Sequence, residues 1–256
     1  MYKDFLMKKM PTFVLILIFA VLISSCGASR HIKPETRNKI NNVEVRIIFP
    51  DSGIHGDTKT SGLYGIFGAV VASSREKNFA EAIKPLAESL QTYNIPNKTK
   101  DIYKARMNKV SWMKVKKWNV DFIKYPEYRK MTKASKHDAV LFIETKYFLS
   151  TDFKKLKVYA KSNMYINNGN NTEPRKVFSL MDDYLYDMTK HSGGEFDRAK
   201  LASKWSENNA KIIKEKIIKA INIQANYLLK NLDPPKNQKE ESFWERFTGK
   251  NKNVRE

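Results

Sequence analysis

The sequence predicts an α+β domain, in which helices cover a mixed, mostly antiparallel sheet. The first observation is residues 43–49 (VEVRIIF), which alternate and are rich in the β-branched side chains that strands favour. The second is a pair of similar stretches, 138–149 and 156–166, joined by a connection short enough for an antiparallel hairpin. The third is residues 197–232, where apolar residues recur at the spacing of one face of a long amphipathic helix.

The remaining elements are predicted from weaker patterns. Residues 78–93 have helical spacing, although Pro85 predicts a kink or a late start there. Residues 102–136 fit either a helix or a strand, and short strands are expected at 177–180 and 184–188. The apolar face of the last helix is expected to consist of Leu201, Trp205, Ile213, Ile217, Ala220, Ile221 and Leu228.

The first 25 residues have the layout of a secretory signal. Three lysines, at positions 3, 8 and 9, precede the uncharged apolar run 13–23. This run is too short to cross a bilayer, which takes about 20 apolar residues, but it fits the ~7–15-residue core of a signal peptide. We therefore expect residues 1–25 to be removed on export.

The apolar run is followed by Ile23-Ser24-Ser25-Cys26-Gly27, which resembles the lipobox of bacterial lipoproteins. The resemblance implies cleavage after Ser25 and attachment of a diacylglycerol to the Sγ atom of Cys26, with a further acyl chain on its amine. Ile23 is a small departure, because leucine is more usual at this place. The alternative is an ordinary signal peptide whose cleavage site lies near a cysteine. Cys26 is the only cysteine of the chain, which excludes an intramolecular disulfide.

The exported chain is expected to be a single domain between two polar segments. Residues 26–42 are interpreted as the lipidated cysteine and a tether, and 43–232 as the domain. Residues 233–256 are interpreted as a disordered tail, in which 243–247 (FWERF) offers a short docking motif. Within the domain, glycines recur every third residue over 61–72. They favour a tight crossing of helices, or else contact with the membrane.

The chain is strongly basic, with a formal net charge of +20. Residues 97–136 contain thirteen lysines and arginines against Asp101, Asp121 and Glu127, and such a field favours polyanions. For an exported protein these are anionic lipid head groups or lipopolysaccharide phosphates, and not nucleic acid. The alternative is a solvated basic face in a lysine-rich protein. The candidate contacts with an anionic surface are Lys114, Lys116, Lys117, Trp112 and Trp118.

The sequence contains no pattern that predicts catalysis or metal binding. The four histidines are scattered without the spacing of metal ligands. Asp182 and Asp183 are adjacent, and neighbours on a strand point to opposite faces, so they would not act as a pair. No motif for an activated nucleophile is present. We therefore expect no catalytic residue, no metal and no cofactor beyond the acyl chains on Cys26.

The order of the elements carries a broader resemblance. The chain resembles uncharacterised Gram-negative lipoproteins through its lipobox, GLYGIFGAVV, DAVLFIETKYFLS, LKVYAKSNMYI and SKWSENNAKIIKEKI. In outline it is similar to envelope lipoproteins with a domain like the N-terminal domain of TolB or the curli-export lipoprotein. The resemblance implies a non-enzymatic binding or assembly module with an envelope protein as partner. Gly27 favours anchoring in the outer membrane, at its periplasmic or surface face. An envelope-acting hydrolase and a surface-exposed, host-facing lipoprotein are the alternatives.

Overall fold

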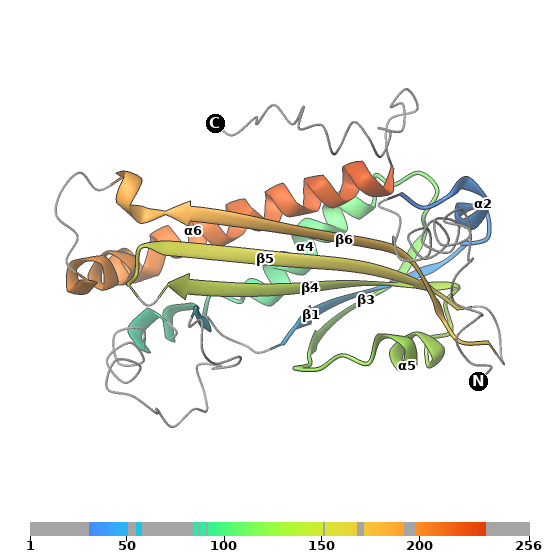
Figure 1. Cartoon of the computed structure of the whole chain (residues 1–256), viewed down its shortest axis with the longest axis horizontal. Coiled ribbons are helices and arrows are strands. Elements are labelled where there is room, and N and C mark those ends of the chain that lie inside the picture. Colours follow the sequence, from blue (N-terminus) through green and yellow to red (C-terminus); the bar gives the residue numbers. More distant parts are fainter. Residues whose placement is uncertain are drawn as a thin grey trace, which may run out of the picture.

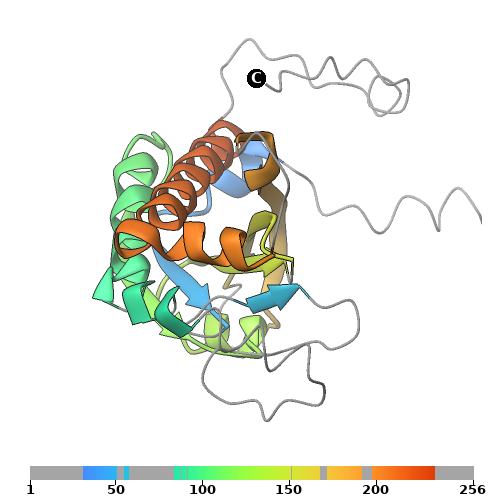
Figure 2. The same cartoon turned by 90° about the vertical axis from the view of Figure 1, so that its left-hand side faces the viewer.

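Figures 1 and 2 show the computed structural model of the chain, which describes residues 31–50, 55–57, 84–86, 88–90, 92–150, 152–167, 172–191 and 198–233. Several predictions fall outside these residues: the signal peptide, the lipidation site, the glycine-spaced segment 61–72 and the docking motif 243–247. The described residues form one sheet with helices on both faces. Among them, no helix is both long and apolar enough to span a membrane.

The sheet is mixed, as predicted, and the α+β fold class is confirmed. The strands are β1 (Val43–Phe49), β2 (His55–Asp57), β3 (Val115–Phe122), β4 (Ala139–Ser150), β5 (Lys155–Ile166) and β6 (Arg175–Asp187). The helices are α2 (Pro34–Arg37), α4 (Ile95–Met107), α5 (Tyr128–Lys133) and α6 (Arg198–Leu232), with a 3-10 turn η1 (Met188–His191). The strand order is β3-β1-β4-β5-β6, and β2 lies beside β4 beyond the end of β1. β1, β2 and β3 take part in parallel ladders, whereas β4, β5 and β6 form the longer antiparallel ladders.

The predicted hairpin is present as β4 and β5, whose register runs from Ala139 opposite Ile166 to Leu149 opposite Leu156. Two short strands were predicted after the hairpin. This prediction is wrong in one respect, because both stretches belong to the single continuous strand β6. The ambiguous stretch 102–136 contains both types of element, namely the end of α4, strand β3 and helix α5.

Helices α4 and α6 cover one face of the sheet and enclose the main core (Figures 1 and 2). α4 lies over β1 and β3, and α6 lies over β5 and β6. All seven residues predicted for the apolar face of the last helix are buried. Burial of a large apolar side chain contributes about 1.5–3 kcal/mol, so this layer is the main source of the stability of the domain.

α6 is not the single regular helix that its periodicity predicts. Glu207 has an extended backbone, and Asn208, Asn209 and Ala210 have φ angles of 51°, 58° and 58°, so the helix consists of two segments. Asparagine tolerates the left-handed region better than most residues, which places the break at the two asparagines. Lys214 Nζ donates to the carbonyl oxygen of Asn209 at 2.6 Å and bridges the break from the second segment.

The segment before β1 belongs to the domain. The side chains of Ile32 and Ile40 are 1% and 3% exposed and are part of the main core. The backbone N–H of Asn42 donates to Asp138 Oδ2 at 3.1 Å and fixes the entry into β1. The predicted tether is therefore wrong over residues 32–42. Two isoleucines in a polar stretch give too weak a pattern to be read as core.

Candidate functional site

The second face of the sheet carries the short helix α5, which contacts β4 and β5. The ring of Tyr128 lies 4.9 Å from that of Phe142 and 5.9 Å from that of Tyr165, measured between ring centres. Together with Ile48 and Val140 these rings form a second, smaller apolar cluster. This cluster holds α5 against the sheet.

Glu44 of β1 lies at the centre of a polar network on this face and is 1% exposed. Its carboxylate accepts hydrogen bonds from Asn119 Nδ2 at 2.5 Å and Ser135 Oγ at 2.6 Å, and Arg46 Nη2 lies 2.8 Å away. Burial raises the pKa of Glu44, but the hydrogen bond from Ser135 and the charges of Arg46 and Lys117 outweigh this effect. The pKa of Glu44 therefore lies below its ordinary value, and the group is a carboxylate at neutral pH.

Glu44, Ser135 and His137 include the residue types of a catalytic triad, but their geometry differs from one. Ser135 Oγ lies 3.2 Å from His137 Nδ1, and Glu44 Oε2 lies 3.6 Å from the same nitrogen. In a triad, one ring nitrogen faces the hydroxyl and the other faces the carboxylate. Ser135 also donates to Glu44 and accepts the backbone N–H of His137 at 3.2 Å. These contacts fix the connection between α5 and β4 and leave no activated nucleophile.

Glu144 of β4 is the second buried carboxylate on this face. Tyr128 Oη donates to it at 2.6 Å, and Lys146 Nζ lies 2.6 Å from its other oxygen. Burial raises the pKa of Glu144, but the hydrogen bonds from Lys146 and Tyr128 lower it below the ordinary value. Burial of the ring and the hydrogen bond to Glu144 raise the pKa of the Tyr128 phenol.

The two glutamates are too far apart to act as an acid–base pair. Glu44 lies opposite Val140, and Glu144 lies opposite Ile48, four residues further along the ladder. At ~3.3 Å per residue this is an offset of about 13 Å, whereas paired carboxylates in glycoside hydrolysis stand at most about 9.5 Å apart. Each glutamate instead serves its own network.

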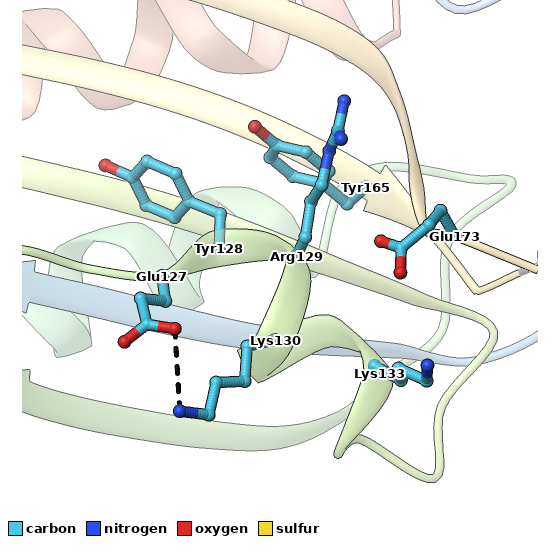
Figure 3. Close-up of a pocket in the computed structure, with 7 residues that line it drawn as sticks. All are labelled: Glu127, Tyr128, Arg129, Lys130, Lys133, Tyr165 and Glu173. Atoms are coloured by element: carbon cyan, nitrogen blue, oxygen red, sulfur yellow. Dashed lines mark ion pairs between the residues drawn. The ribbon is translucent and has the colours of Figure 1, made fainter.

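A solvent-open pocket of about 580 Å³ lies between α5 and β5, and Figure 3 shows the residues that line it. They are Glu127, Tyr128, Arg129, Lys130, Lys133, Tyr165 and Glu173. Lys130 Nζ lies 3.5 Å from Glu127 Oε2, and the charged residues of the lining are all exposed. The pocket can offer donors to a small anion, but solvent screens its charges. In the described part of the chain, no three His, Cys, Asp or Glu side chains gather as metal ligands.

The structure does not bring the sequence-predicted contacts together on one surface. Lys114, Lys116 and Lys117 are exposed, whereas Trp112 and Trp118 are half-buried against the main core. Lys117 lies beside Glu44, with 3.7 Å between Nζ and Oε1, on the α5 face. Its neighbour Trp118 is opposite Val45 and therefore lies on the other face.

Trp112 has a structural role as well. Its indole N–H donates to the carbonyl oxygen of Leu232 at 3.0 Å, and the guanidinium of Arg37 lies 5.6 Å from its ring centre. The two tryptophans are thus part of the fold. Cys26 and Ser25, the predicted lipidation and cleavage residues, lie outside the described residues.

The large apolar side chains that the fold exposes are found elsewhere. Met181 and Leu185 of β6 are 61% and 58% exposed, and Phe122 at the end of β3 and Tyr125 just after it are 57% and 70% exposed. Sequence analysis missed all four. A hydrophobic residue in a strand is expected to be buried, and only the order of strands shows that β3 and β6 are the outermost ones in the described sheet.

The sequence matches no protein-family model. It also matches no curated protein. Among solved structures, one titled as an uncharacterized protein is 12% identical, with 68% of this chain and 90% of that chain covered and a TM-score of 0.24. A hypothetical protein from Chlamydia trachomatis is 9% identical, with 72% and 98% covered and a TM-score of 0.28. Neither likeness bears on the function.

Proposed function

We propose that this chain is a lipid-anchored binding module of the bacterial envelope. The acyl chains on Cys26 hold it at the outer membrane, at the periplasmic or surface face, and a protein partner binds to β5 and β6. The lipobox supports the anchor. The observation that supports the binding surface is the exposure of Met181 and Leu185 on one face of β6.

The two side chains lie on the α5 face of the sheet, where apolar and charged side chains of β5 and β6 are neighbours. Met181 lies opposite Lys161 and Leu185 lies opposite Lys157. Between them Asp183 forms an ion pair with Lys157 at 3.1 Å. A partner that covers these side chains gains roughly 1–2 kcal/mol from each exposed apolar side chain, and the charges define its orientation.

The position of β6 adds backbone groups to this surface. β6 is the outermost strand on its side of the described sheet. The outer edge of such a strand presents N–H and C=O groups to which an extended segment of a partner can add. A strand added there would place its side chains beside Met181 and Leu185.

Site-specific crosslinking tests this proposal. A photo-reactive phenylalanine replaces Met181 or Leu185 in cells, and Lys219, exposed on the outer side of α6, provides the control position. We expect one crosslinked product of the same mass from both β6 positions and none from position 219. The double variant Met181→Ala and Leu185→Ala should lose co-purification of that partner. Products of equal yield from all three positions would count against the surface.

A further inference from the structure

Phe122 and Tyr125 are aromatic side chains that the fold leaves in solvent. Phe122 is the last residue of β3, and Tyr125 lies in the connection between β3 and α5. Lys124 stands between them in sequence, with its Nζ atom 5.7 Å from the centre of the Tyr125 ring. Two aromatic rings and one ammonium group are thus presented by four consecutive residues.

The backbone that carries these rings is held in place. The N–H of Ile123 donates to the carbonyl oxygen of Phe49 at 3.0 Å, and Ile123 packs against the smaller apolar cluster. The ring of Phe122 lies 6.0 Å from that of Phe49 at the end of β1. Since the sheet already holds the backbone of this segment, binding of the rings to a surface costs little conformational entropy of the chain.

The segment that carries the rings is positively charged. Residues 122–133 contain four basic residues against one acidic residue. The acidic one, Glu127, lies 3.5 Å from Lys130, measured between Oε2 and Nζ, so the segment as a whole carries a net positive charge. All four basic side chains are exposed, and Arg129, Lys130 and Lys133 lie on α5 (Figure 3).

We propose that residues 122–133, here called the aromatic–basic segment, contact the surface of an anionic lipid bilayer. Aromatic rings are favoured at the depth of the head groups, where one side is apolar and the other is wet. Basic side chains beside them are attracted to an anionic leaflet within about a Debye length. The proposal rests on the proposed function, because the acyl chains hold the domain beside the membrane, where even a weak contact is populated.

The first experiment uses the lipidated full chain in vesicles. Cys26 is the only cysteine and carries the anchor, so a cysteine introduced elsewhere takes a fluorescent label at one place. The label replaces Tyr125, or Leu185 as a control with similar exposure. In vesicles of phosphatidylcholine with one third phosphatidylglycerol, quencher lipids should dim the label at position 125 and not at 185. The quenching should fall in pure phosphatidylcholine and at high salt.

The second experiment removes charge at matched sites. Lys124→Gln, Lys130→Gln and Lys133→Gln together should lower the ratio of contacting to non-contacting protein about 100-fold, since each basic group contributes about 1 kcal/mol beside an anionic surface. The control is Lys200→Gln, Lys219→Gln and Lys230→Gln, three exposed positions on α6, which should change it little. Melting temperatures show whether either variant is still folded.

Three outcomes would overturn the proposal: no quenching at position 125 in anionic vesicles, equal effects of the two triple variants, or loss of the quenching on adding inorganic phosphate at constant ionic strength. The last outcome would indicate a site for a free anion. A photo-reactive phenylalanine at position 125 that crosslinks to a protein in cells, together with quenching that ignores lipid composition, would indicate a protein contact instead. Failure of the proposed function is read separately, from the mass of the Cys26 adduct and from crosslinking at Met181.

Discussion

The indole N–H of Trp205 donates to the backbone carbonyl oxygen of Phe153 across 2.7 Å, in the interior of the domain. Trp205 lies in the first segment of α6, before the break at residues 207–210. Phe153 lies in the turn between β4 and β5 and has a φ angle of 59°. The bond therefore ties the short first segment of α6 to the hairpin.

Replacing Trp205 tests this coupling. Trp205→Phe removes the donor and leaves unfilled space at a fully buried position, so the free energy of unfolding should fall by about 2–4 kcal/mol. Trp112→Phe is the matched control, because it also removes an indole bond to a carbonyl, but at a half-buried position. Its effect should stay near 1 kcal/mol. Urea unfolding followed by circular dichroism measures both, and equal losses would contradict the assigned role of Trp205.

Glu44 should make the stability depend on pH in the acidic range. Its pKa is lower in the folded protein than in the unfolded chain, so its stabilising contribution is present above the unfolded value of about 4.3 and is lost as pH falls through the folded value. Glu44→Gln should cost about 1–3 kcal/mol at pH 7. In this variant the free energy of unfolding should also decrease less steeply than in the parent as the pH falls below about 5. Glu127→Gln, at an exposed ion pair, should change neither quantity measurably.

Burial of the second segment of α6 can be tested with two isoleucines of the same helix. Ile217 is 0% exposed and Ile223 is 43% exposed. Ile217→Asp places an unpaired carboxylate in the core, which costs several kcal/mol against a total stability of about 5–15 kcal/mol. This variant should be unfolded or degraded, whereas Ile223→Asp should melt close to the parent. A folded Ile217→Asp protein would mean that this face is not part of the core in solution.

Where hydrophobic periodicity is strong, the sequence predicts the fold well. β1 has the predicted bounds, and the hairpin and the buried face of α6 follow from local patterns. The break in α6 could not be predicted in this way. Trp205 and Ile213, on either side of the break, are both buried, so the apolar spacing continues across it. The strand order could not be predicted from the sequence either. β1 pairs with β3 and β4, and the connections between these strands contain no local pattern that indicates pairing.

The candidate surfaces depend on that order and were therefore harder to predict. The basic stretch 97–136 is evident in the sequence, but Trp112 and Trp118 were predicted as its aromatic contacts because they flank Lys114, Lys116 and Lys117. Both serve the core, and Phe122 and Tyr125 are the exposed aromatics of this stretch. The network around Glu44 also escaped notice, because Asn119 and Ser135 meet it only in the folded sheet.

The proposed lipid anchor at Cys26 leads to a prediction about where the protein is found. One acyl chain holds a protein only marginally to a bilayer, at about 0.8 kcal/mol per buried methylene, whereas two or three chains make release negligible. The parent protein should therefore be found entirely in the membrane fraction, with a mass that includes the acyl chains on Cys26. Cys26→Ala should yield either uncleaved precursor or soluble protein.

Ser25→Leu is a useful companion to Cys26→Ala, because it disturbs the small residue before the cleavage point and leaves the thiol in place. It should accumulate precursor that still carries the diacylglycerol on Cys26. Cell fractionation with mass spectrometry of the purified protein separates these products. Wild-type protein in the soluble periplasmic fraction, with an unmodified thiol at position 26, would show that residues 1–25 form an ordinary signal peptide.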